Sequence, residues 1–289
     1  MSHSSTPKGV DFSPVKINFT YKGEDLSTWN DNDEGKSHFW NVISCVLPPI
    51  ETYVIKAVSD VLHTIEDEKL LYEARMFCRQ ESAHAHTHDE LNRMLLAKYP
   101  SLEKFEKVDY FLLKFLSKCL SKKVFIGIFV FVEHLTAVLG HRGLERPERW
   151  FDKADPALFD MWQWHALEEV AHKSVCYDVH KALNGGYFSR FIGFVIGFFL
   201  LLLPGIFARC IYLGFRSPNK RRFFGQLLSH LVGKDGVFRV ILKDFFEYFK
   251  FTYQPWDLDS RKILNDYHAE SQDDGQEGLQ TQFIIKGIK

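Results

Sequence analysis

One stretch of the chain, Trp162–His172, limits most strongly what this sequence can fold into. In a helix, His165, Glu169 and His172 are spaced i, i+4 and i+7, so they project from one stripe. The residues around them are mostly apolar or aromatic, which is not typical of a solvated helix face. Because a carboxylate is costly to bury without a partner, the stripe predicts a buried helix whose polar side chains bind a cation.

The pattern Glu-x-x-His occurs twice. Glu81 and His84 are three residues apart, as are Glu169 and His172, and side chains at i and i+3 share one face of a helix. Four-helix di-iron proteins take one such pair from each of two helices and a single glutamate from each of the other two. The repeated pattern therefore directs attention to two further glutamates.

Two glutamates on other apolar segments meet this requirement. Glu133 interrupts Lys122–Leu139, which is apolar on nearly all sides, and a carboxylate buried there needs a cation or a tight partner. Glu51 follows Pro48 and Pro49, which predict a helix break and a new helix from about residue 50. An acidic residue in a first turn is also favoured by the helix dipole, so Glu51 has a structural explanation as well.

The most apolar part of the chain is Phe191–Ala208, eighteen residues without a charge. This length is at the lower limit for crossing a bilayer, and Pro204-Gly205 predicts a kink. Arg190 and Arg209 bracket the segment, and Lys220–Arg222 is a basic cluster that suits an anionic lipid surface. The alternatives are a buried core helix and a membrane-associated helix, and we prefer the second.

Composition bears on partners and compartment. The net charge of −1 gives no global electrostatic reason to expect nucleic acid. The five cysteines include no Cys-x-x-Cys pair and no apolar signal opens the chain, so we expect a reduced, cytoplasmic location. Peripheral or integral attachment at the inner face of the membrane is the alternative. An aromatic share of 15% suits an apolar substrate cavity as well as an aromatic core.

The candidate metal ligands resemble those of known di-iron proteins. In chain order they are Glu51, Glu81, His84, Glu133, His165, Glu169 and His172. Without His165 the set resembles the ferritin-like di-iron carboxylate proteins. With His165 it resembles di-iron N-oxygenases of the p-aminobenzoate N-oxygenase type, in which His-x-x-x-Glu-x-x-His supplies an extra histidine. This resemblance covers the motifs between Glu51 and His172.

A longer resemblance, from about residue 39 to residue 253, is to a bacterial family of predicted metal-dependent hydrolases. The signature blocks of that family are similar to Phe39–Ser44, to Gln80–His84 with His88, and to Trp164–Glu169 ahead of His172. Where the family often has a second acidic residue before the last histidine, this chain has Ala171. Glu168 and Glu169 both stay candidates for a bridging ligand, and the i, i+3 spacing favours Glu169.

Two further histidines lie close to the candidate ligands. His88 extends the face of Glu81 and His84 by one turn, and we expect it to orient a ligand, as metal-bound groups usually require. His134 is adjacent to Glu133 and therefore points about 100° away from it. We expect His134 to be a hydrogen-bonded core or supporting residue.

These patterns predict an all-α fold: a ferritin-like four-helix bundle with additional C-terminal helices, one of them strongly apolar. The four bundle helices are expected near 50–64, 67–98, 122–142 and 156–183. The expected domains are an N-terminal surface arm at 1–36, a two-metal helical bundle at 37–186, apolar and amphipathic helices at 187–254 that pack on the bundle or a membrane, and a polar, extended tail at 255–289.

The ligand set suits two iron ions, with manganese or zinc as alternatives, because mixed carboxylate and imidazole donors accept several first-row metals. The preferred function is a non-haem di-iron oxygenase or oxidase that uses O2 on a small apolar, lipid-like substrate, since Phe, Trp and Leu surround the motifs. A two-metal hydrolase is the runner-up. A non-enzymatic iron-binding or membrane-associated protein is the third alternative. The sequence identifies no electron donor and leaves a homodimer open.

Overall fold

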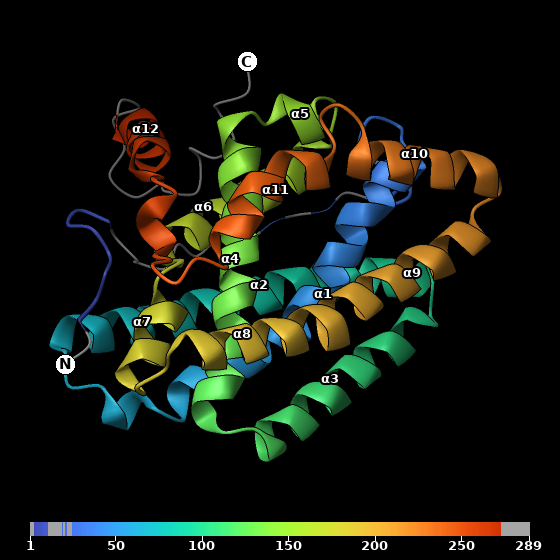
Figure 1. Ribbon diagram of the computed structural model, residues 1–289. Coiled ribbons are helices and arrows are strands. Elements are labelled where there is room, and N and C mark those ends of the chain that lie inside the picture. Colours follow the sequence, from blue (N-terminus) through green and yellow to red (C-terminus); the bar gives the residue numbers. More distant parts are fainter. Residues whose placement is uncertain (1–2, 11–18, 20, 22–24, 273–289) are drawn as a thin grey trace.

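The computed structural model describes residues 3–10, 19, 21 and 25–272, and its regular structure is helical (Figure 1). No strand occurs within this described part of the chain, so the all-α prediction is confirmed. The helical elements are α1 Glu34–Ser59, η1 Leu62–Thr64, α2 Glu68–Lys98, α3 Leu102–Cys119, α4 Lys122–Glu145, α5 Glu148–Phe151, α6 Pro156–His172, α7 Val175–Ala182, α8 Tyr187–Ile196, η2 Gly197–Leu202, α9 Leu203–Arg216, α10 Lys220–Val232, α11 Val237–Glu247, η3 Pro255–Asp257 and α12 Arg261–Gln272.

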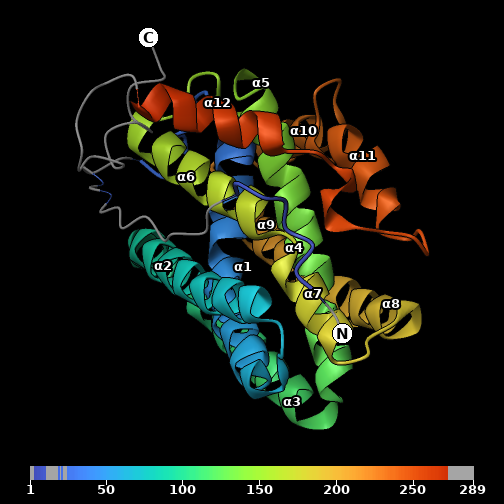
Figure 2. The same ribbon diagram turned by 90° about the vertical axis from the view of Figure 1, so that its left-hand side faces the viewer.

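The helices α1, α2, α4 and α6 form the centre of the molecule. α1 packs along α2, and α4 packs along α6 (Figure 2). Their apolar side chains form two core clusters, one including Val54, Phe77 and Phe129 and the other including Trp40 and Met161. On α2, α4 and α6 the candidate ligands begin where residues of one cluster are followed by residues of the other, and on α1 Glu51 lies between Ile50 and Val54 of the first cluster. The polar centre is therefore closed in by apolar packing on both sides.

α1 is one continuous helix, so the predicted break at Pro48 and Pro49 is wrong. Pro48 lacks the N–H group that would bond to the carbonyl oxygen of Ser44 in a regular helix. The side chain of Asn92 on α2 replaces that donor, because its Nδ2 donates to Ser44 O at 2.9 Å. As a consequence Glu51 lies inside a helix, where the dipole of a helix N-terminus gives no explanation for it.

The predicted helix at 156–183 is in fact two helices, α6 and α7, which meet directly after His172. Two residues of the connecting turn are held by distant parts of the chain. Lys173 Nζ donates to Leu258 O and to Ser260 Oγ, and Ser174 Oγ accepts a hydrogen bond from Trp256 Nε1 at 3.1 Å. Periodicity within 156–183 carries no information about these contacts. α3 is a further helix that the predicted bundle did not include.

Both ends of the chain are more structured than predicted. The arm at 1–36 was expected on the surface, yet Trp29 and Asn30 are buried, and Trp29 Nε1 donates to Asn41 Oδ1 at 3.0 Å. The tail from residue 255 was expected to be extended, but it contains η3 and α12. The remainder of that tail, 273–289, lies outside the described residues.

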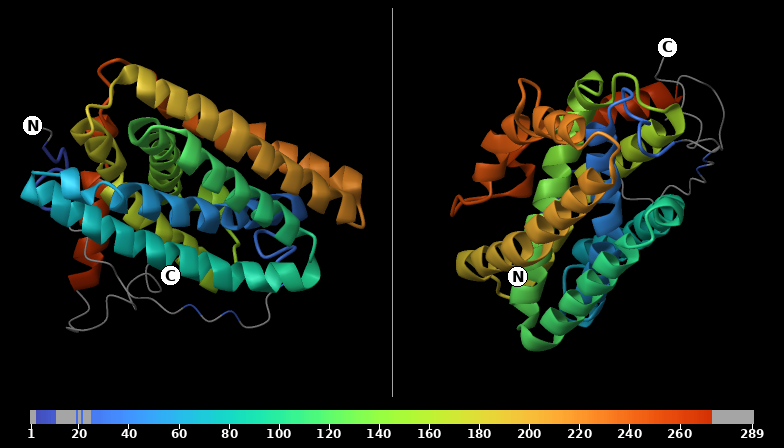
Figure 3. Two further views of the ribbon diagram at one scale, coloured as in Figure 1. Left: turned by 90° about the horizontal axis from the view of Figure 1, so that it is seen from below. Right: turned by 90° about the vertical axis from the view of Figure 1, so that its right-hand side faces the viewer.

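The strongly apolar segment runs through α8, η2 and α9, which follow one another as a single rod along one side of the molecule (Figure 3). η2 is a π-helical turn placed just before Pro204, and such a wide turn accommodates a proline without ending the helix. In the part of the chain that the structure describes, three helical segments are long and apolar enough to cross a membrane: Glu34–Thr64, Lys122–Glu145 and Tyr187–Arg216.

Candidate metal centre

The structure brings all seven candidate ligands into one buried cluster. Each of them is at most 4% exposed. The cluster takes Glu51 from α1, Glu81 and His84 from α2, Glu133 from α4, and His165, Glu169 and His172 from α6. Four helices that are far apart in the sequence therefore place carboxylate and imidazole groups against one another.

One half of the cluster consists of Glu81, Glu133 and His172, whose candidate ligand atoms all lie within 4.8 Å of one another. His172 Nε2 is 3.1 Å from Glu81 Oε1 and 3.3 Å from Glu133 Oε2. An imidazole nitrogen and two carboxylates gathered in this way are a typical donor set for a first-row metal.

The other half consists of Glu51 and His84 together with His165. Two triplets, one of Glu51, Glu81 and His84 and one of His84, His165 and Glu169, each keep their candidate ligand atoms within 4.8 Å. Glu169 Oε1 lies 3.1 Å from His165 Nε2, and Glu169 Oε2 lies 3.5 Å from His172 Nε2. Glu81 and Glu169 thus belong to both halves and are placed to bridge two ions.

Unpaired polar atoms provide a test of whether these residues fit a metal pair. Six buried atoms of the cluster make no hydrogen bond of good geometry to the described residues: Glu51 Oε1, Glu51 Oε2, Glu81 Oε1, His84 Nδ1, Glu133 Oε2 and His172 Nε2. Among them, His172 Nε2 has only the ion-pair contacts with Glu81, Glu133 and Glu169, and the two Glu51 oxygens have no ion-pair contact with a described residue. A buried polar atom that is left unsatisfied costs about 1–3 kcal/mol. Two divalent cations would satisfy these atoms, and four carboxylates would balance the charge of both ions. The donor set therefore fits a two-metal centre.

Two of the imidazoles are oriented by hydrogen bonds on their other nitrogen. His84 Nε2 lies 2.9 Å from Glu168 Oε2, which leaves His84 Nδ1 directed at the cluster. His172 Nδ1 lies 3.1 Å from Gln80 Oε1, which leaves His172 Nε2 directed at the cluster. Metal-bound histidines characteristically have such supporting partners. Glu168, a candidate bridging ligand from the sequence, is instead placed to orient His84.

A longer chain of hydrogen bonds orients His165. Asn92 Nδ2 donates to Ser44 O, so Asn92 Oδ1 is the acceptor that receives the Ser44 hydroxyl at 2.8 Å. Ser44 Oγ must then accept from His88 Nδ1 at 2.9 Å. Burial lowers the pKa of His88 well below its usual value, so this neutral ring accepts from His165 Nδ1 at 3.0 Å through Nε2. The lone pair of His165 Nε2 is thereby left for the cluster.

The carboxylates of the cluster are shifted in opposite directions. Burial and the neighbouring charge of Glu81 raise the pKa of Glu51 well above its usual value. Burial, with the charges of Glu81 and Glu169, raises the pKa of Glu133 to about 8. Burial also acts to raise the pKa of Glu169, but His172 and the other imidazoles outweigh it and hold that pKa well below its usual value. Without cations, bound protons thus neutralise some of the carboxylate charge that metals would otherwise neutralise.

Some supporting residues were missed by the sequence analysis, and one predicted alternative lies elsewhere. Gln80 and Ser44 fall inside the signature blocks but were given no role, and Thr136, which donates to Glu169 Oε2, was not noticed at all. Thr136 follows Glu133 by three residues on α4, and this spacing was its only signal. His134 points away from the cluster and contacts Asp244 O at 3.0 Å and the Tyr253 hydroxyl at 3.0 Å.

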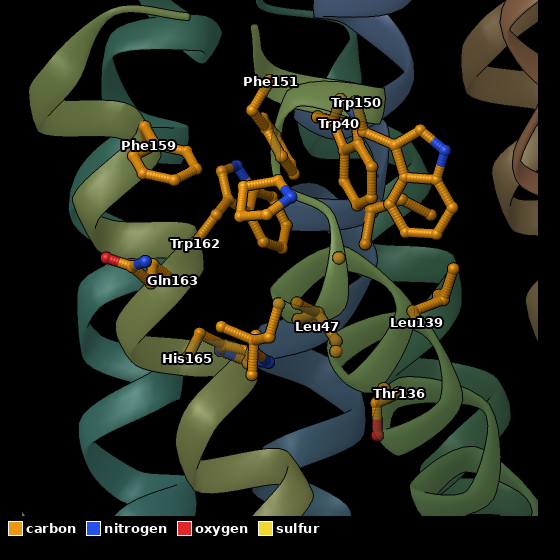
Figure 4. Close-up of a pocket in the computed structure, with 16 residues that line it drawn as sticks. Trp40, Leu47, Thr136, Leu139, Trp150, Phe151, Phe159, Trp162, Gln163 and His165 are labelled. Atoms are coloured by element: carbon orange, nitrogen blue, oxygen red, sulfur yellow. The ribbon is translucent and has the colours of Figure 1, made fainter. Parts of the chain in front are cut away.

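An apolar pocket reaches the cluster beside His165. Figure 4 shows Trp40, Trp150 and Trp162 gathered at one end of it, with His165 and Thr136 at the other. Among the described residues, its lining includes no Asp, Glu, Lys or Arg. We call this cavity the tryptophan pocket. Its volume is about 60 Å³, so it offers a small apolar group a position beside the candidate ligand His165.

Comparison with known proteins gives one match. A family model described as "Predicted metal-dependent hydrolase" matches residues 14–259, which is most of the chain. No curated protein and no solved structure matches this chain.

Proposed function

Because the chain belongs to the family of predicted metal-dependent hydrolases, we propose that it is a two-metal enzyme whose first candidate reaction is hydrolysis of an apolar substrate. The observation that carries this proposal is the set of six buried carboxylate and imidazole atoms, without a well-formed hydrogen bond to the described residues, that four helices direct at one another. Glu51, His84 and His165 would hold one ion, and Glu133 and His172 would hold the other. Glu81 and Glu169 would bridge both.

The chemistry comes from the bound ions and the positioning from the protein. When bound, two divalent ions would supply a Lewis acid and an activated water for hydrolysis or, if both are iron, electrons for reducing O2. The hydroxyl of Thr136 holds the Glu169 carboxylate through its Oε2 atom. The chain of His88, Ser44 and Asn92 keeps the proton of His165 on Nδ1. The aromatic end of the tryptophan pocket would bind the apolar part of the substrate and exclude water from the ions.

Oxidation of an apolar substrate with O2 is the second candidate function. A specific observation favours it: the lining of the tryptophan pocket includes no Lys or Arg that would hold a phosphate or carboxylate substrate. The donor set of four carboxylates and three imidazoles is also close to the one that four-helix di-iron proteins use. The preference for an oxygenase that the sequence suggested thus stays a proposal, and iron stays its proposed metal.

A pair of activity assays separates the two reactions. Anaerobically purified, metal-loaded protein is given nitrophenyl esters of increasing acyl length, and O2 uptake is measured separately in the presence of a reductant and the same acyl chains. For a hydrolase we expect ester cleavage that a chelator abolishes, and for an oxygenase we expect metal-dependent O2 uptake without ester cleavage.

Matched variants provide the control. Glu133→Gln should lose whichever activity is found, whereas Glu145→Gln, the same change at the exposed end of the same helix, should keep it. Absence of both metal-dependent activities from a folded, two-metal protein would overturn the proposed enzyme function.

A further inference from the structure

One side of the molecule exposes far more apolar surface than a water-soluble protein usually does. In the most apolar part of Tyr187–Arg216, which has a mean hydropathy of 2.5, only 28% of the residues are buried. Phe199 and Phe207 of this rod are 52% and 62% exposed, and Phe246 of α11 is 59% exposed. We name this surface, formed by the outer sides of the α8–η2–α9 rod, α10 and α11, the docking face. An apolar surface of this kind marks a binding site.

The inner side of the rod is fixed to the bundle, so only its outer side is available to a membrane. A Cβ atom at Gly193 would lie 2.2 Å from the carbonyl carbon of Gly127, so only glycine permits the close contact between α8 and α4. At one end Arg190 donates to the carbonyl oxygens of Tyr248 and Lys250, and at the other end Arg209 pairs with Asp109. The rod therefore presents one side only, the geometry of a helix lying in the plane of a membrane interface.

An apolar groove opens in the docking face. It lies between α9 and α11, has a volume of about 660 Å³, and is lined by apolar side chains and Cys210. Its inner wall includes Ile43 of α1 and Leu139 of α4. The same two residues also line the tryptophan pocket, whose other end is His165. Two side chains thus form a shared wall between the groove and the tryptophan pocket.

Charge identifies which apolar partner fits this face. The chain as a whole has a net charge of −1. Residues 187–254, without the buried Arg190, Arg209 and Asp244, contain eight Lys or Arg and two Asp or Glu, a net charge of +6. Lys220, Arg221 and Arg222 are exposed in the first turn of α10, beside the face. Basic side chains around an apolar face are complementary to the surface of an anionic bilayer.

We propose that the docking face binds an anionic lipid bilayer and that the groove receives an acyl chain from it. The acyl chain would pass between Ile43 and Leu139 into the tryptophan pocket. If the chain is the proposed enzyme, its substrate class is then an acyl-chain lipid. Only this assignment of a substrate rests on the proposed function. Docking and occupation of the groove do not depend on the metals.

Vesicle binding tests the docking. Full-length, metal-loaded protein is mixed with vesicles of phosphatidylcholine, with or without phosphatidylglycerol, and bound protein is measured by flotation. We expect binding that increases with phosphatidylglycerol and falls with salt, and a loss of about tenfold or more in affinity for Phe207→Ser/Phe246→Ser. Tyr72→Ser is the matched control, because Tyr72 is an aromatic residue 53% exposed on α2, which lies on the opposite side of the molecule in both views of Figure 3.

Two results would overturn the docking. One is equal vesicle affinity for the wild type and the Phe207→Ser/Phe246→Ser variant. The other is a wild-type dimer that the same two substitutions separate into monomers without any vesicle binding, which would make a second copy of the chain the occupant of the face. Sedimentation velocity on both proteins decides between these outcomes.

Tryptophan quenching tests the groove. A brominated stearic acid is the probe, because bromine near the end of the chain quenches a tryptophan that it contacts, and Trp40 and Trp162 lie beyond the shared wall. We expect saturable quenching in the wild type and several-fold weaker quenching in Ile206→Phe or Leu203→Phe, which fill the groove. Ile192→Phe, on the same rod but outside the groove lining, should behave as the wild type.

Metal content, measured on the same samples, separates the two proposals. Unaltered quenching in both filling variants, with two metals bound and normal helical content, would overturn the groove assignment and leave the metal centre standing. Quenching and vesicle binding in a protein that takes up no metal would overturn the proposed function and leave the docking face standing.

Discussion

Two regions of this molecule reverse the usual distribution of polar and apolar side chains, in opposite senses. The cluster around Glu81 and Glu169 places charged groups in the interior, and the docking face places phenylalanines in contact with solvent. A buried carboxylate and an exposed aromatic patch are each unfavourable unless a partner covers them. Under our two proposals, both anomalies have the same kind of explanation, a partner that is not protein: cations for the cluster and lipid for the face.

The helices α4 and α8–α9 make the comparison more specific. Both are apolar enough to cross a membrane, with mean hydropathies of 1.8 and 2.5, yet the most apolar part of α4 is 78% buried and that of the rod is 28% buried. The buried helix carries Glu133, a member of the cluster, whereas the exposed stretch Phe191–Ala208 carries no charge. Hydropathy alone does not separate a helix that is buried in the bundle from one that leaves its apolar side exposed.

The largest effect is expected from removing a ligand. His172→Ala and Glu133→Gln should each lower metal content from two ions per chain to one or none, because each removes a donor that no neighbour can replace. Elemental analysis after dialysis checks this, and circular dichroism should show that most helical content is kept. Full occupancy in both variants would mean that the buried charges have a purpose other than metal binding.

A smaller loss is expected from the residues that orient the ligands. Gln80→Leu or Ser44→Ala should weaken metal binding by about 10- to 100-fold, because the histidine that each supports loses its fixed tautomer and orientation. Ser82→Ala, on the exposed side of α2, is the control. Competition with a metal-binding dye gives the affinities, and an unchanged value for both variants would show that neither residue supports a ligand.

Metal binding should also depend on pH. Glu133, with its pKa raised to about 8, holds its proton at pH 7 when no metal is bound, and a metal must displace that proton. The affinity should therefore rise between pH 6 and 8 by up to about tenfold per pH unit for each displaced proton. Isothermal titration calorimetry in buffers of different ionisation enthalpy counts the protons released, and a count of zero would contradict the expected rise in affinity with pH.

One substitution in the cluster is expected to stabilise the metal-free protein, although it weakens metal binding. Glu51→Met removes two unsatisfied buried oxygens, so it should raise the free energy of unfolding of the metal-free chain by about 1–3 kcal/mol. The same variant should gain less stability from added metal than the wild type gains. Denaturant unfolding with and without a chelator measures both quantities. Destabilisation of the metal-free protein by Glu51→Met would indicate that protein contacts already satisfy this carboxyl group.

The smallest effect on stability is expected from a substitution on the docking face. In the absence of lipid, Phe207→Ser should change the free energy of unfolding by less than about 0.5 kcal/mol, because its side chain is already 62% exposed. Phe194→Ser, on the buried side of the same rod, should instead cost about 3 kcal/mol or more. Equal losses for the two variants would show that Phe207 is covered by protein in solution.

The sequence predicts which residues gather in the buried cluster because helical spacing and apolar surroundings are local properties. A glutamate inside an apolar helix, and Glu-x-x-His on two others, are visible without a structure. The continuity of α1 is not, because it depends on Asn92, which lies 44 residues beyond Pro48 in the chain. Gln80 and Thr136 were missed for a related reason, since only their contacts across helices distinguish them from ordinary polar residues. Whether an apolar helix ends up buried or exposed is likewise decided by what packs on it.

The most direct test of the central claim is anomalous X-ray diffraction from crystals of the anaerobically purified protein, with data collected at the iron, manganese and zinc absorption edges. We predict two anomalous peaks about 3.5–4 Å apart, each beside Glu81 and Glu169, with one near His84 and the other near His172. A single peak, or none in protein that was given metal, would contradict a two-metal centre in this cluster.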